Sequence, residues 1–146
     1  MRLLDQVHVA RRFQRSIRID TDLHDPKALE GFICPKSLAE ALLTMAGHIQ
    51  RTKQAAFTWT GPYGSGKSSL VVALSAALNG NAALRNEAAV TLGEDVITAV
   101  WDALPPKTKG WRILPVVGQR AKPAEIIGAA LIANGYLAKG RVRRWT

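Results

Sequence analysis

The stretch FTWTGPYGSGKSSLVVAL, Phe57–Leu74, decides which fold the sequence predicts. It begins within AAFTWT, Ala55–Thr60, whose aromatic and β-branched residues are typical of a buried strand. A glycine-rich loop follows, and then SLVVALSAALNG, in which Leu70, Leu74 and Leu78 recur at helical spacing before Asn-Gly ends the helix. Strand, glycine loop and helix, in this order, form the local structure that a phosphate-binding loop requires.

The residue types of the loop suit contact with phosphate. Its glycines permit positive φ angles and let backbone N–H groups approach a ligand closely. The helix that begins near Gly66 adds unpaired N–H groups and the positive end of its dipole. Lys67 can stabilise the β- and γ-phosphates, and the Ser68 hydroxyl is placed to ligate Mg²⁺. The candidate site comprises Gly61, Pro62, Tyr63, Gly64, Ser65, Gly66, Lys67, Ser68 and Ser69.

The segment TGPYGSGKSSL, Thr60–Leu70, is similar to the Walker A motif of P-loop NTPases. The layout before it, GFICPKSLAEALLTMAGHI followed by a strand, resembles the beginning of AAA+ and STAND-type ATPase modules, and the N-terminal part of very large bacterial ATP-binding proteins. This resemblance implies an α/β fold with a parallel sheet flanked by helices, ATP with Mg²⁺ as the ligands, and an arginine finger supplied in trans.

A Walker B element, which would supply carboxylates for Mg²⁺ and the attacking water, is not recognisable. The nearest candidate is VITAVWDAL, Val96–Leu104, with Asp102. Its apolar residues fall at helical offsets, and Ala103 stands where a second acid is expected. We therefore interpret Asp102 as an exposed residue near a helix end, with a role in the metal shell as the alternative.

Other segments complete the expected secondary structure. SIRIDTDL, Ser16–Leu23, reads as a short extended segment, and CPKSLAEALLTMAGHIQ as an amphipathic helix with a capping box from Ser37 to Glu40. GWRILPVVGQRA, Gly110–Ala121, has the content of a second strand, and KPAEIIGAALIANGYLAKG, Lys122–Gly140, that of a helix.

Two strands are too few for a doubly wound sheet, which normally needs about five. We therefore expect an incomplete P-loop NTPase, the N-terminal portion of a larger domain, or a chain completed by a partner subunit. Residues 1–54 would form a basic segment and helix leading into the module, and residues 55–146 the strand, loop and helix with the next strand and helix.

Three functions remain open from the sequence. The first is ATP·Mg binding within an ATPase that couples hydrolysis to conformational work on a partner or a nucleic acid. The second is a regulatory or interaction module that binds nucleotide without hydrolysis. The third is a small-molecule kinase, which the long segment before the loop disfavours.

Composition adds limits on setting and partners. The charge of +9 arises largely at the two ends, in ARRFQRSIR and KGRVRRWT, so contact with nucleic acid is possible. Cys34 is the single cysteine, which fits a reducing, cytoplasmic location. No stretch approaches about 18 uninterrupted apolar residues, so we expect no membrane span. The three histidines lie far apart, which disfavours a zinc-type site.

Overall fold

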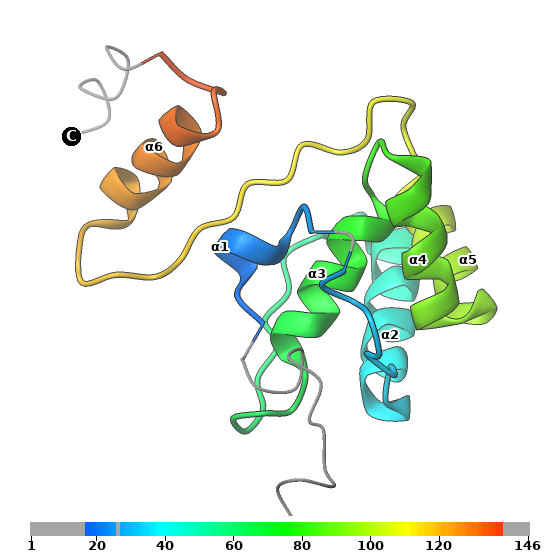
Figure 1. The fold of residues 1–146 in the computed structure, drawn as a ribbon. Helices are drawn as coiled ribbons and strands as arrows, with labels where there is room; N and C mark the ends of the chain where they lie inside the picture. The colour runs from blue at the N-terminus through cyan, green and yellow to red at the C-terminus, as the bar shows by residue number, and fades with distance from the viewer. Residues whose placement is uncertain (1–16, 26, 139–146) are drawn as a thin grey trace, which may run out of the picture. The chain divides into compact units, whose positions relative to one another are not determined.

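The computed structural model describes residues 17–25 and 27–138, and within them the regular structure is helical. The chain divides into two compact units, Met1–Trp111 and Arg112–Thr146. The helices, coloured along the chain in Figure 1, are α1 (Ile19–Asp22), α2 (Lys36–Thr52), α3 (Lys67–Ala77), α4 (Ala82–Leu92), α5 (Glu94–Ala103) and α6 (Pro123–Ala133).

The core of the first unit is built by helix packing. α2 packs on α5, α4 packs on both α3 and α5, and α1 packs on α3, so that α3 lies between α1 and α4 (Figure 1). The largest fully buried side chains are those of Leu42, Leu70, Val72 and Val100, which come from three of these helices. The phosphate-binding loop predicted from the sequence therefore joins a helix that is held by neighbours on opposite sides.

Helix α3 differs from its neighbours because it is buried on almost every side. Its buried residues are Leu70, Val72, Ala73, Ser75, Ala76 and Ala77, which do not follow a single helical stripe. A helix that is apolar all round belongs in the interior of a protein. Several of these residues are alanines, whose small side chains allow neighbouring helices to approach closely.

The C-terminal end of α3 is fastened to the segment that follows α5. Trp101 of α5 donates from its indole Nε1 to the Ala77 carbonyl at 3.0 Å, and the Trp111 backbone N–H donates to Leu78 at 2.9 Å. Asn79 and Gly110 form an isolated β-bridge. A Cβ on Gly110 would lie 2.2 Å from the Gly80 nitrogen, so only glycine fits at this crossing.

Helix α2 confirms the amphipathic helix expected before the loop, but its first turn differs from the prediction. Pro35 is the N-cap, and Ser37 lies inside the helix, so the capping box from Ser37 to Glu40 is wrong. The Pro35 carbonyl instead accepts from the N–H groups of the first turn, and Glu40 lies 3.8 Å from the Lys36 ammonium. Pro35 has φ −65°, and it has no side-chain acceptor for the N–H groups of the first turn.

The prediction of an α/β fold with a parallel sheet is wrong for the described part of the chain. Ala55–Thr60 and the residues from Gly110 to Ala121, both expected as strands, belong to no ladder, and most of their side chains are exposed. Ser16–Leu23, expected to be extended, contains α1 instead. A strand is stabilised by hydrogen bonds to a neighbouring strand, and strand-like composition does not supply that neighbour.

The second unit contains α6 and the coil before it. Pro123 occupies the first turn of α6, Lys122 is the N-cap, and Gly135 follows the C-cap Asn134 with φ +71°, which confirms the helix expected in this region. The Arg112 guanidinium lies 5.7 Å from the centre of the Tyr136 ring. Gly128 is the buried residue of α6, whereas Ile126 and Ile132 are half-buried and Ile127 is 46% exposed.

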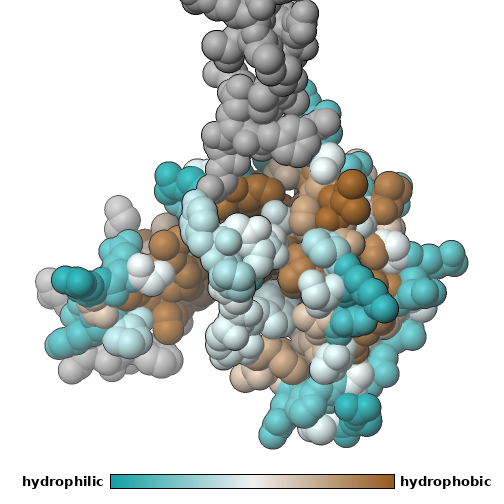
Figure 2. Space-filling view, turned by 90° about the horizontal axis from the view of Figure 1, so that it is seen from below, coloured by the Kyte–Doolittle hydropathy of each residue, from teal (hydrophilic) through white to brown (hydrophobic). Residues whose placement is uncertain are grey.

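Apolar side chains also reach the surface elsewhere. Figure 2 shows hydrophobic residues between polar ones on one face of the molecule. The most exposed large apolar side chains include those of Ile33, at 84%, and Val90, at 83%.

Candidate functional site

The glycine loop ends at the N-terminus of α3 in a conformation that exposes backbone donors. Gly64 and Gly66 adopt φ angles of +79° and +82°, and Gly66 is the N-cap with no side-chain hydrogen bond. Among the described residues, no hydrogen bond uses the backbone N–H of Lys67, Ser68 or Ser69. These N–H groups and the helix dipole favour an anion at this position.

The surroundings of the three loop glycines differ. A Cβ on Gly66 would lie 3.0 Å from Leu38 Cδ1, and one on Gly61 would lie 3.1 Å from Ser65 Oγ. A Cβ on Gly64 would meet nothing within 4 Å. Gly66 is therefore constrained both by its left-handed backbone and by α2, whereas Gly64 is constrained by its left-handed backbone alone.

The Lys67 ammonium is bound by the loop itself. It donates hydrogen bonds to the carbonyls of Gly61 and Pro62, each at 2.8 Å, and to Ser65 Oγ at 3.3 Å. Its positive charge therefore lies over the loop, beside the N-terminus of α3. A phosphate that enters the loop would compete with these carbonyls for the same ammonium.

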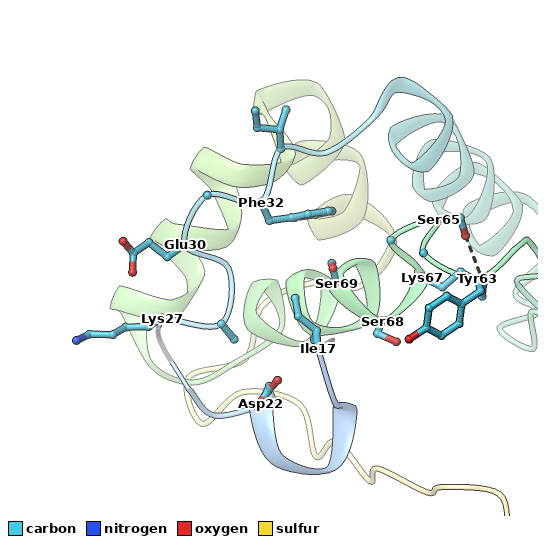
Figure 3. Close-up of a pocket in the computed structure, with 15 residues that line it drawn as sticks. Ile17, Asp22, Lys27, Glu30, Phe32, Tyr63, Ser65, Lys67, Ser68 and Ser69 are labelled. Atoms are coloured by element: carbon cyan, nitrogen blue, oxygen red, sulfur yellow. Dashed lines mark hydrogen bonds between the residues drawn. The ribbon is translucent and has the colours of Figure 1, made fainter. Parts of the chain in front are cut away.

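A pocket of about 620 Å³ opens in front of the loop (Figure 3). The loop residues that line it are Tyr63, Gly64, Ser65, Gly66, Lys67, Ser68 and Ser69. The remaining lining residues come from the segment before α2 and are Ile17, Asp22, Lys27, Ala28, Glu30, Gly31, Phe32 and Ile33. We call this second group the N-terminal wall.

The N-terminal wall carries a buried carboxylate. Asp22 is 3% exposed, and its carboxylate accepts from the Arg18 backbone N–H at 3.0 Å and from the Thr21 hydroxyl at 2.9 Å. Nearby, the Arg18 guanidinium donates to both oxygens of Asp20, at 3.1 and 2.6 Å. This hydrogen-bonded contact lowers the pKa of Asp20 and raises that of Arg18.

The structure brings together the site residues expected from the sequence. Residues Tyr63 to Ser69 line the pocket, and Gly61 and Pro62 contribute carbonyls to the Lys67 ammonium. Tyr63 is 94% exposed. The wall residues, in contrast, are not predicted from the sequence, because neither their spacing nor their composition links them to the loop, which begins 28 residues after Ile33.

Asp102, the weak candidate for the metal shell, lies exposed in α5 and is not part of the pocket lining. The helix that contains it, α5, confirms the helical interpretation of Val96–Leu104. Within residues 17–25 and 27–138, no group of three or more His, Cys, Asp or Glu side chains gathers where it could hold a metal ion. Among described residues, Ser68 remains the side chain predicted to contact Mg²⁺.

Much of the expected basic surface lies outside the described residues. Outside them are Arg11, Arg12 and Arg15 at one end and Lys139, Arg141, Arg143 and Arg144 at the other. His8 and Trp145 also lie outside the described residues. Of the other tryptophans, Trp101 and Trp111 each donate an indole N–H to a backbone carbonyl, and the Lys107 ammonium lies 4.2 Å from the centre of the Trp111 ring. Both indole rings are therefore held by contacts within the fold.

No protein-family model matches this sequence, and neither a curated protein nor a solved structure matches it. The identification as a P-loop NTPase of the AAA+ or STAND kind is wrong, because that fold is built on a parallel sheet and the described residues form none. The description of the chain as a P-loop ATPase fails for the same reason. No described helix is long and apolar enough to cross a membrane.

Proposed function

We propose that residues Gly61–Ser69 bind the phosphate chain of ATP together with Mg²⁺, on a helical scaffold and without turnover. The observation that carries this proposal is the uncapped N-terminus of α3, whose first backbone N–H groups follow two left-handed glycines and meet a pocket. Anions are stabilised at such a helix terminus by N–H donors and by the dipole together.

Lys67 and Ser68 give this site its preference for a phosphate chain with a metal ion. The Lys67 ammonium already lies against the loop, where it can exchange its carbonyl partners for phosphate oxygens. Ser68 lines the same pocket from the first turn of α3, so its hydroxyl can contribute one oxygen to Mg²⁺.

Binding without turnover is the form of the function that the described residues favour. Hydrolysis needs a carboxylate to position or polarise the attacking water. Asp102, the weak candidate from the sequence, is exposed in α5 and does not line the pocket. Of the two carboxylates that do line it, Asp22 is buried and already accepts hydrogen bonds from the Arg18 N–H and the Thr21 hydroxyl, and Glu30 is exposed. Ligand binding alone can change the stability of a protein and so regulate it.

The setting and partners are part of the same proposal. A single cysteine, Cys34, fits a cytoplasmic protein, and the basic ends would suit contact with a nucleic acid or an acidic partner. Nucleotide binding at the loop would then regulate that contact.

Calorimetric titration of the chain with Mg·ATP, followed by a phosphate-release assay on the same sample, tests the proposed function. We expect saturable binding with no release above background. Absence of binding would contradict the assignment of the loop, and steady phosphate release would contradict binding without turnover.

A further inference from the structure

The segment between α2 and the loop has a backbone without partners among the described residues. Ala55–Thr60 runs here without a turn or bend (Figure 1). No backbone hydrogen bond between described residues, and no β-ladder, involves this segment. Its side chains are exposed, except that Trp59 is half-buried. An exposed stretch of unpaired N–H and carbonyl groups is a template on which another strand can pair.

The side chains of this segment suit a strand, and there is free space beside them. Aromatic and β-branched residues favour strands, and in a strand Phe57 and Trp59 share one face because successive side chains alternate. The Phe57 ring lies against His48 of α2, with ring centres 5.8 Å apart. A groove of about 500 Å³ opens between the segment and α2, where Thr44, Met45 and His48 line it. Further aromatic side chains can therefore be accommodated beside Phe57.

The segment is complementary to itself in one antiparallel register. A two-fold axis through a strand pair places opposite each other only residues of the same face. With this axis at Thr58, the two copies of Thr58 lie opposite each other, Phe57 lies opposite Trp59, and Ala56 lies opposite Thr60. Directly opposed aromatic pairs and Thr–Thr pairs both stabilise antiparallel strands. The axis repeats the Phe57–Trp59 contact, so a single register forms it twice.

The charge distribution along the chain also permits a second copy at this segment. Two chains with a net charge of +9 each repel one another, which favours the monomer. Charged side chains on an exposed strand, above all lysine, are the usual protection against pairing with another copy. Residues 54–66 include no Asp, Glu, Lys or Arg. The stretch with the unpaired backbone therefore lacks the charges that would keep a second copy away.

From these observations we propose that Ala55–Thr60 pairs with the same segment of a second copy of this chain, as an antiparallel two-stranded ribbon, and so forms a closed dimer. The inference is independent of the proposed function, because Gly61–Ser69 takes no part in the pairing. A pair of short strands is only marginally stable in water by itself. The dimer is therefore expected to form reversibly and to depend on protein concentration.

Sedimentation equilibrium of the whole chain, without nucleotide and over a series of protein concentrations, tests the inference. The mass should rise from 15.8 kDa toward twice this value as the concentration increases. It should rise no further, because a two-fold contact uses the same surface of both copies and leaves none free for a third.

Substitutions at Thr58 locate the contact, because this exposed residue would meet its own copy at the axis. Thr58→Lys places two ammonium groups opposite each other, and Thr58→Glu two carboxylates, so each should raise the dissociation constant of the dimer by about tenfold or more. An equimolar mixture of the two variants pairs opposite charges and should restore dimer formation. Ala83→Lys, at an exposed position of α4, is the charge control and should change the dissociation constant by less than about threefold. Circular dichroism establishes that each variant is folded.

Several results would overturn the inference. A wild-type mass that stays at 15.8 kDa up to the solubility limit would show that the segment does not pair with a second copy. A mass that rises beyond the dimer would exclude a closed two-fold contact. If folded Thr58→Lys associates as tightly as the wild type, the copies meet elsewhere. If the mixture of Thr58→Lys and Thr58→Glu associates no more than either variant alone, the two copies of Thr58 are not opposed and the register is wrong.

Discussion

Replacing Lys67 with alanine removes the one cation among the loop residues and separates its two possible roles. In the ligand-free structure the ammonium donates to two loop carbonyls and to Ser65 Oγ. With ligand bound, the same ammonium is expected to donate to phosphate oxygens. The substitution therefore tests whether the lysine serves the fold or the ligand.

The structure predicts a small effect of Lys67→Ala on stability. The lost hydrogen bonds are partly exposed to solvent, so their net contribution is about 1 kcal/mol or less. Lysine at the first position of α3 is also unfavourable next to the positive end of the helix dipole, by about 0.3–1 kcal/mol. Because these two effects oppose each other, we expect the free energy of unfolding to change by less than about 1 kcal/mol.

The effect on ligand binding should be much larger. A hydrogen bond to a charged group contributes roughly 1.5–3 kcal/mol, so the dissociation constant for Mg·ATP should rise by about 10- to 150-fold. Calorimetry measures that change, and urea denaturation measures stability. Lys36→Ala is the matched control, because it removes the same charge from a side chain that is 91% exposed.

Two results would refute the reasoning. Unchanged ATP affinity in Lys67→Ala would show that the ammonium does not contact the ligand. An equal loss of affinity in Lys36→Ala would show that net charge, rather than the loop, attracts the nucleotide.

The remaining predictions concern stability, measured by urea or thermal denaturation. Gly66→Ala should be more destabilising than Gly64→Ala. Both substitutions place alanine at positive φ, which costs about 1–2 kcal/mol, but only at Gly66 would the new methyl group meet Leu38, at 3.0 Å. Equal losses of stability in the two variants would contradict this. Lys53→Gly should stabilise the protein by up to about 1 kcal/mol, because Lys53 ends α2 in the left-handed region, with φ +62°, which glycine adopts more readily. A loss of stability would show that the backbone of Lys53 is not strained. Asn81→Ala should destabilise α4 by about 1 kcal/mol, because the Asn81 side chain accepts from the Ala83 N–H at 2.8 Å, whereas no loss would mean that this cap is dispensable.

The helices could be predicted where their signals are local. α2, α5 and α6 follow from apolar residues at helical spacing and, for α6, from the proline at its start and the glycine after its end. α4 was not foreseen, although Leu84, Ala88 and Leu92 recur every fourth residue and Asn81 is a good N-cap. An asparagine before an alanine-rich stretch could have indicated it.

The sheet could not be predicted reliably, because strand formation depends on partners elsewhere in the chain. Ala55–Thr60 has the side chains of a strand, but the structure gives it no ladder. Its Phe57 ring instead meets His48 of α2 edge-on, with ring centres 5.8 Å apart. The N-terminal wall was missed for a related reason, since its place opposite the loop is set by the packing of α1 on α3.

The packing of α3 explains how a phosphate loop could be held without a sheet. In an α/β protein the strand before the loop and the helix after it are both fixed by the sheet. Here the helix is buried on nearly every side, and Leu38 and Phe32 lie against Gly66 at its first turn. The first-turn residues of α3 that line the pocket are therefore positioned by α3 and by the segments that cover it. The segment before the loop contributes little to that rigidity, so changes in Ala55–Thr60 should alter ligand binding less than changes at Leu38, whose contact holds Gly66 in place.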